Sequence, residues 1–180
     1  MNIKQYKKFE FQIALQVEFQ IVRYSLLERK SSYDYPISYI EIFFSDGFPY
    51  VNRYGVKDFI KERTEGMMFE RIELHIDNEH NVAYIHEPID FSRSDITPEV
   101  HQLIENDDIV KLCKMGFLGY TVMTKDNLFH LLLLWGEFVD KKAPYILIYL
   151  DDKDYYDTLS FDSKESMDKF VAEHTKKETN

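Results

Sequence analysis

Residues 68–86 read MFERIELHIDNEHNVAYIH, and this stretch decides the fold. Its apolar and polar residues alternate on both sides of a polar loop at 78–81, as they do in strands with one buried face. With that loop, residue 77 lies opposite residue 82, and the apolar residues of the two segments pair with one another. The pairs are Leu74 with Ile85 and Ile76 with Ala83. Because one register brings all four together, the stretch predicts an antiparallel hairpin.

Further strand patterns lie on both sides of this hairpin. Every odd position of residues 9–21 is apolar and five of the six even positions are Glu or Gln, which predicts one long strand with a face exposed to water. Residues 145–150 form a continuous apolar run of strand length, which indicates an interior strand. Three shorter segments are also predicted as strands: 38–44, 120–123 and 155–161, the last as the partner of 145–150.

Helix patterns separate these strands. Thr97 and Pro98 form a typical helix start, with Thr as the N-cap and Pro in the first turn. The apolar segment 127–139 predicts a central helix, and Asp162 to Glu165 resembles a capping box. Two short helices are also predicted. The first covers 56–63, with Gly66 as its end, and the second covers 108–115. Strands and helices do not alternate regularly, so we expect a single α+β domain over residues 1–174, mostly antiparallel, with a frayed tail at 175–180.

Composition excludes several classes of protein. Hydrophobic residues make up 44% of the 180 residues, enough for a packed core. The single cysteine, Cys113, excludes an internal disulfide, and the formal charge of −10 disfavours direct binding to nucleic acid. Glu10 and Gln12 interrupt any apolar leader segment, and the most apolar stretch, 128–139, is too short to span a membrane. We therefore expect a cytoplasmic protein without membrane contact.

The compact motifs of catalysis are missing from the sequence. It has no Walker A motif, no G-x-G-x-x-G, no H-E-x-x-H and no G-x-S-x-G, and its six glycines offer little for a phosphate-binding loop. These observations lower the expectation of an enzyme, and no cofactor is predicted.

The densest polar segment is 151–157, Asp-Asp-Lys-Asp-Tyr-Tyr-Asp. Three interpretations are open. The first is a solvated hairpin turn. The second is a protein-binding edge, in which carboxylates supply charge and tyrosines supply contact area. The third is part of a metal centre. For the last, Asp140, Asp151 and Lys153 resemble the Asp…(Asp/Glu)-x-Lys pattern of restriction-endonuclease-like enzymes. That resemblance implies Mg²⁺-dependent phosphodiester cleavage, although the basic DNA-binding track of those enzymes is missing.

Negative charge is concentrated in one part of the sequence. Residues 1–66 hold 10 basic and 9 acidic side chains, whereas residues 67–180 hold 12 and 23. If these acids converge in space they form an anionic face for a basic partner, and if they are dispersed they serve solubility. Both arrangements are compatible with the sequence.

Histidine and cysteine side chains allow weaker hypotheses. The predicted hairpin holds a group that could ligate a metal: His75, Asp77, Glu79, His80 and His86. The register separates these residues, so a polar sheet face exposed to water is the competing interpretation and no metal is predicted. His130 is expected to bond a backbone carbonyl, and Cys113 to be a small buried side chain.

In composition, the chain resembles bacterial toxin-immunity proteins, which are compact, acidic inhibitors of basic, often nuclease, toxins. The resemblance implies a protein-binding inhibitor that covers the active site of a basic toxin domain. Two alternatives remain. The chain is a metal-dependent phosphodiesterase, or it is a structural or regulatory subunit whose partner binds the 9–21 strand or a sheet edge. The predicted partner contacts are Asp151, Asp152, Asp154, Tyr155, Tyr156 and Asp157, with Glu105, Asp107 and Asp108 as outer charges.

Overall fold

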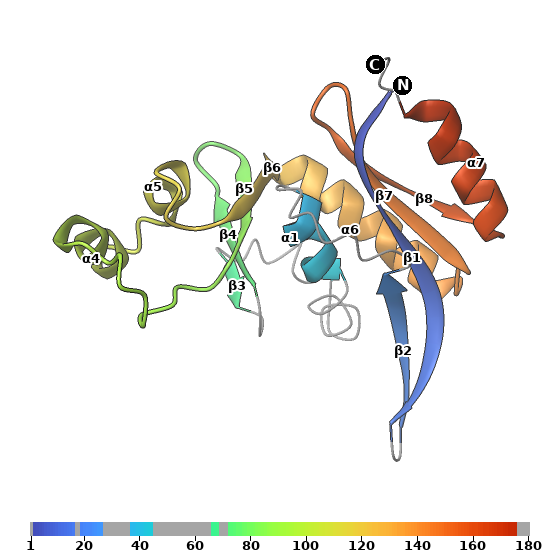
Figure 1. Cartoon of the computed structure of the whole chain (residues 1–180), viewed down its shortest axis with the longest axis horizontal. Helices are drawn as coiled ribbons and strands as arrows, with labels where there is room; N and C mark the ends of the chain where they lie inside the picture. The colour runs from blue at the N-terminus through green and yellow to red at the C-terminus, as the bar shows by residue number, and fades with distance from the viewer. Residues whose placement is uncertain (1, 17–18, 27–36, 45–65, 69–71, 176–180) are drawn as a thin grey trace.

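Two four-stranded antiparallel sheets form the framework of the computed structural model (Figure 1). The structure describes residues 2–16, 19–26, 37–44, 66–68 and 72–175. The first sheet has the order β2-β1-β7-β8, with bounds β1 Ile3–Gln16, β2 Phe19–Leu26, β7 Tyr145–Asp151 and β8 Tyr156–Phe161. The second has the order β3-β4-β5-β6, with bounds β3 Gly66–Met68, β4 Glu73–Asp77, β5 Val82–His86 and β6 Tyr120–Thr124. The fold is a single α+β domain, as the sequence predicts.

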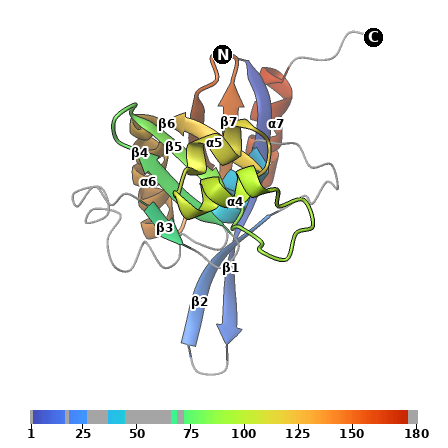
Figure 2. The ribbon, with the colours of Figure 1, turned by 90° about the vertical axis from the view of Figure 1, so that its left-hand side faces the viewer.

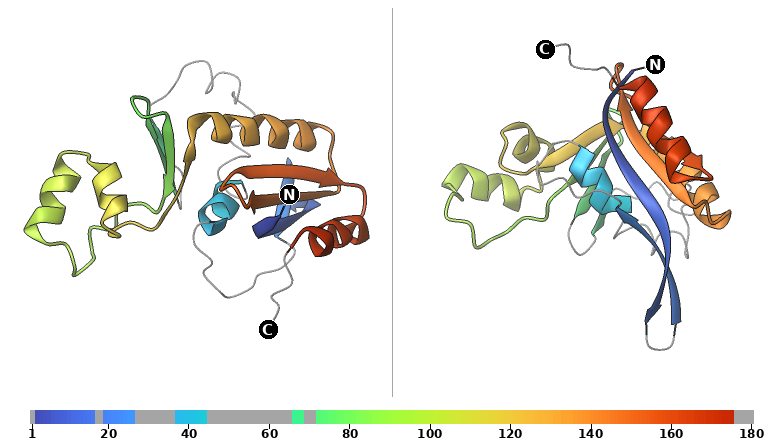
Figure 3. Two further views of the ribbon diagram at one scale, coloured as in Figure 1. Left: turned by 90° about the horizontal axis from the view of Figure 1, so that it is seen from above. Right: turned by 45° about the vertical axis from the view of Figure 1, so that its right-hand side comes forward.

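The helices cover the sheets in layers (Figures 1 and 3). Helix α6 (Lys125–Asp140) starts at the end of β6 and lies along one face of the first sheet, while α7 (Lys164–His174) covers the opposite face. Helix α1 (Ile37–Ile42) lies between the two sheets. Helices α4 (Pro98–Glu105) and α5 (Ile109–Lys114) cover the outer face of the second sheet and form one end of the molecule (Figure 2).

The main core lies between the two sheets. Its buried side chains come from both sheets and from α1 and α6, and Trp135 of α6 is among the largest, at 1% exposed. The Trp135 ring meets Phe9 of β1 edge-to-face at 5.2 Å and Phe44, just beyond α1, at 4.7 Å. These contacts join elements from the two ends of the sequence, so α6 is the central helix that its composition predicts.

The hairpin predicted from residues 68–86 is confirmed in its register. Glu73 pairs with His86, Leu74 with Ile85 and Ile76 with Ala83. The first strand of this hairpin is β4, which begins at Glu73. Gly66 is predicted as a helix end, but it starts β3, which pairs with β4.

The predicted helix starts at Thr97 and Asp108 are also confirmed. The hydroxyl of Thr97 accepts from the Val100 N–H, and the carboxylate of Asp108 accepts from the Lys111 N–H. Thr124 caps α6, which starts two residues before the predicted segment 127–139. At α7 the N-cap is Ser163, whose hydroxyl accepts from the Ser166 N–H, and not Asp162 as a capping box over 162–165 requires. Strand β7 is interior between β1 and β8, as its apolar run predicts.

Two strand predictions are wrong in detail. The alternating run 9–21 does not form one strand, because Gln16 pairs with Phe19 and the pattern continues from β1 into β2. Residues 38–44 form most of α1 and its continuation instead of a strand. The sequence pattern of a short run that is almost entirely apolar does not separate strand from helix. In the structure, Ile37, Ile40 and Phe44 are buried at helical spacing. The helix predicted at 56–63 lies outside the described residues.

The outer face of the second sheet is covered, contrary to the expectation of a face exposed to water. Tyr84 packs in a separate hydrophobic cluster with side chains of α4 and α5, and His86 is 1% exposed. Near the end of the chain, Thr175, predicted as the start of the tail, still bridges to Ile3, and the remaining residues of the predicted tail, 176–180, lie outside the described residues.

Candidate partner-binding site

The predicted contact segment, residues 151–157 (the acidic turn), joins β7 to β8. One oxygen of Asp151 accepts from the backbone N–H of Lys153 at 2.8 Å and of Tyr155 at 2.9 Å. Asp154 adopts a left-handed backbone conformation, with φ of 62°. One of the two carboxylate oxygens of Asp151 therefore shapes the turn.

Asp157 is also engaged within the protein. Its Oδ1 lies 3.1 Å from His130 Nε2 on α6 and accepts from the Thr158 N–H at 2.8 Å. Its Oδ2 accepts from the Tyr149 hydroxyl at 3.1 Å. Burial, together with the charge of Asp157, raises the pKa of Tyr149. His130 thus bonds a carboxylate, and not the backbone carbonyl that we expected.

Tyr156 is a core residue. It is 2% exposed, and burial raises its pKa to about 12. Its backbone is held by the Asn127 side chain of α6, which accepts from the Tyr156 N–H at 2.9 Å and donates to the Tyr156 carbonyl at 2.6 Å. Because β8 is the edge of its sheet, Asn127 takes the place of a further strand at this position.

Four residues of the acidic turn remain at the surface: Asp152, Lys153, Asp154 and Tyr155. Asp152 is exposed, and Asp154 forms an exposed ion pair with Lys4 at 2.7 Å. Tyr155 is 40% exposed, with its ring 5.9 Å from that of His130. The acidic turn thus contributes two exposed carboxylates, one exposed lysine and one aromatic ring to the surface.

The other predicted charges lie elsewhere. Glu105 ends α4, Asp107 follows with φ of 54°, and Asp108 is the N-cap of α5. Helices α4 and α5 lie at one end of the molecule, away from the β7–β8 connection in both views (Figures 1 and 3). The predicted acids therefore form two surfaces, the acidic turn and the acidic end, which we define as the described residues 87–116.

The acidic end carries a strong excess of carboxylates. It has seven acidic and three basic side chains, a formal charge of −4. The acids are Glu87, Asp90, Asp95, Glu99, Glu105, Asp107 and Asp108, and the bases are Arg93, Lys111 and Lys114. Glu105 approaches His101 at 3.5 Å, and both side chains are well exposed.

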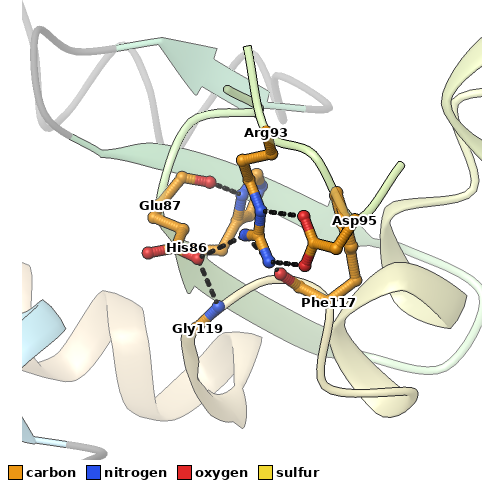
Figure 4. Close-up of polar contacts among 6 residues, drawn as sticks. All are labelled: His86, Glu87, Arg93, Asp95, Phe117 and Gly119. Carbon is orange, nitrogen blue, oxygen red and sulfur yellow. Dashed lines mark hydrogen bonds and ion pairs between the residues drawn. The ribbon is translucent and has the colours of Figure 1, made fainter. Parts of the chain in front are cut away.

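Arg93 holds the loop between β5 and α4 against the connection between α5 and β6 (Figure 4). Its guanidinium donates twice to Asp95, at 2.9 and 2.7 Å, and from Nη1 to the Phe117 carbonyl at 2.8 Å. It also lies 4.2 Å from the centroid of the Phe117 ring. Glu87 accepts from the Gly119 N–H at 3.0 Å and approaches Arg93 at 3.5 Å.

The sequence reasoning did not single out Arg93 or Asn127. The spacing Arg93-x-Asp95 is a local signal for an ion pair, but it does not indicate contact with Phe117. Nothing local marks Asn127 as the partner of Tyr156, which is 29 residues away.

The metal-centre alternative fits the structure poorly. Asp140 ends α6 just before β7 begins, whereas Asp151 ends β7. A seven-residue strand spans roughly 20 Å, so these two carboxylates cannot share an ion. In the hairpin, His80 contacts only Asp77 among the proposed ligands, at 2.7 Å, and among the described residues no group of three or more such side chains could hold a metal.

Cys113 is a buried side chain, as predicted. It is 1% exposed, and burial raises its pKa to about 12. A thiol in this setting stays protonated at neutral pH and is a poor nucleophile.

Comparison of the chain with models of known protein families, with curated proteins and with solved structures found no match. Within the described part of the chain, no helix is both long and apolar enough to cross a bilayer.

Proposed function

We propose that this chain is a binding protein for a basic protein partner, with the acidic end as the main contact surface. The observation that carries the proposal is the charge of that end, seven acidic against three basic side chains on one projecting part of the molecule. Arg93 is paired with Asp95, so its charge is compensated locally. Complementary charge accelerates encounter and fixes the orientation of a partner.

Several carboxylates of the acidic end are available for contact. Glu99 and Asp107 are exposed and form no ion pair with any other described residue, and Glu105 has, among these residues, only the exposed contact with His101. Asp108 is committed to capping α5. On the acidic turn, Asp152, Asp154 and Tyr155 form the second candidate surface, because Asp151, Tyr156 and Asp157 are engaged within the fold.

The finer proposal is an inhibitor of the toxin-immunity kind. In that role, carboxylates occupy the positions that phosphates take in the active site of a nuclease-type toxin domain, in the cytoplasm of the producing cell. Its test is the protein encoded by the neighbouring reading frame. A basic toxic domain there, neutralised by co-expression of this chain in proportion to its amount, supports the inhibitor. A neighbour that is neither basic nor inhibited counts against it.

The broader proposal is tested with a random library of 12-residue peptides selected on the immobilised chain. The expected result is enrichment of peptides with net positive charge, whose affinity for the chain falls as ionic strength rises. Enrichment of neutral or acidic peptides only would contradict the proposal.

Two matched double variants separate the two surfaces. Glu105→Gln with Asp107→Asn removes two charges from the acidic end, and Asp152→Asn with Asp154→Asn removes two from the acidic turn. Each pair includes one left-handed position, φ 54° at Asp107 and 62° at Asp154, where Asn is well tolerated. We expect the first pair to weaken binding of the cationic peptides more than the second. The reverse order would move the contact surface to the acidic turn.

A further inference from the structure

Phe91 is the most exposed large hydrophobic side chain in the described residues. Its exposed fraction is 73%, against 48% for Leu133, the next in order. The loop that carries it, between β5 and α4, has two apolar side chains that do pack inward, Ile89 and Ile96, against the cluster of α4 and α5. The fold therefore anchors this loop without Phe91.

The turn that presents Phe91 is held by hydrogen bonds on both sides. Asp90 accepts from the Ser92 N–H at 2.9 Å and from the Ser92 hydroxyl at 2.6 Å. The Asp90 carbonyl accepts from the Arg93 N–H at 3.3 Å, which closes a four-residue turn. The bonds from Ser92 hold the pKa of Asp90 below its usual range, so the carboxylate that shapes the turn is ionised at neutral pH.

Arg93 connects this turn to the body of the protein. Its side chain bonds Asp95 and the carbonyl of Phe117 and stacks on the Phe117 ring, which is 7% exposed (Figure 4). Arg93, which closes the turn that carries Phe91, is thus attached to the buried Phe117 in the α5–β6 connection. An exposed ring on a backbone held in this way loses little conformational freedom when a partner covers it.

We propose that Phe91 is the aromatic anchor of the partner-binding surface and packs against apolar side chains flanked by lysine or arginine on the partner protein. The proposal rests on the proposed function and names the residue that makes the central contact. Around Phe91, residues 87–99 carry four carboxylates and one base, Arg93, which Asp95 neutralises. An apolar centre within a charged rim is the usual arrangement of a protein interface.

This charge also decides against a second copy as the occupant. Two copies meeting at Phe91 would bring two regions of formal charge −3 together, and like charges at an interface raise its free energy. A basic partner gains from the same carboxylates. Dimer formation through Phe91 is therefore an outcome that overturns the proposal.

The test uses the purified full chain and the peptides enriched from the 12-residue library. Phe91→Ala is compared with Leu133→Ala, which removes the next most exposed large apolar side chain among the described residues, on α6, and with Tyr155→Ala on the acidic turn. We expect Phe91→Ala to weaken binding of the cationic peptides at least about 30-fold, as for a hot-spot residue, and the other two variants less than about threefold.

A second variant, Arg93→Lys, keeps the ring and the charge but removes the paired bonds to Asp95. Its expected effect is a smaller loss of affinity, with faster amide hydrogen exchange in residues 88–97. Unchanged exchange and unchanged affinity in this variant would contradict a preformed turn.

The outcomes separate the two proposals. Cationic peptides that bind Phe91→Ala as well as the wild type overturn the anchor and leave the proposed function standing. Neutral or acidic peptides that require Phe91 overturn the basic partner. Concentration-dependent dimers in wild type that are lost in Phe91→Ala, measured by analytical ultracentrifugation, assign the ring to self-association and overturn the anchor.

Discussion

Replacing Asn127 by alanine tests how the segment that carries Tyr155 to Asp157 is held. The Asn127 side chain is buried and bonds both the N–H and the carbonyl of Tyr156, at 2.9 and 2.6 Å. The variant leaves two buried backbone groups without a partner, and each such group costs about 1–3 kcal/mol. We therefore expect the free energy of unfolding to fall by about 2–6 kcal/mol, close to the upper range of single substitutions.

The assay is urea unfolding followed by the fluorescence of Trp135, the single tryptophan, which is 1% exposed in the folded chain. The matched control is Asn106→Ala, which truncates an exposed asparagine at the C-cap of α4, whose cap contacts come from its backbone N–H. The control is expected to change the free energy of unfolding by less than about 1 kcal/mol. If the two variants lose similar stability, Asn127 does not hold the edge of the sheet.

Three further predictions concern titratable groups. The bond from Lys8 lowers the pKa of Asp168 in the folded protein. The stability that this carboxylate contributes is therefore present above the pKa of Asp168 in the unfolded chain, and it is lost as pH falls through the pKa of Asp168 in the folded chain. Asp168→Asn should therefore destabilise the chain at pH 7, and urea unfolding should show the difference from wild type disappearing as pH falls through the lowered pKa of Asp168. A difference that persists once this carboxylate is protonated would refute the contribution of charge. The pKa of Cys113 is raised to about 12, so at pH 8 this thiol should react with a thiol reagent only as fast as the chain unfolds. Rapid labelling of the native protein would show that the thiol is accessible. Tyr156, with its pKa raised to about 12, should stay un-ionised at pH 10.5 in an ultraviolet titration in which exposed tyrosines ionise; Tyr156→Phe gives the reference curve, and identical curves at higher pH would contradict the assignment.

The sequence predicts those parts of the fold whose signals are local. The β4–β5 register follows from the alternation of four apolar residues, and the caps Thr97 and Asp108 follow from single-residue preferences. The β1–β2 pair was missed because the alternation of 9–21 continues through both strands. Helix α1 was missed because its apolar face is buried between two sheets, so that few polar residues mark its period.

The candidate site is less predictable for the same physical reason. The sequence locates the acidic segments, but whether a carboxylate is free depends on partners that tertiary packing supplies. Asp157 meets His130 across 27 residues, and Arg93 meets Phe117 across 24. Composition gives the charge of Asp107 and Asp157 equally, and only the fold shows that the first is exposed and the second engaged.

The affinity of a cationic library peptide at two ionic strengths tests the central claim most directly. We predict that raising the ionic strength from about 0.05 M to 0.5 M weakens binding to the wild type at least about tenfold, since the Debye length falls well below the spacing of surface charges. The Glu105→Gln, Asp107→Asn variant should show a clearly smaller change. Equal affinity of the wild type at both ionic strengths would contradict recognition of a basic partner by the acidic end.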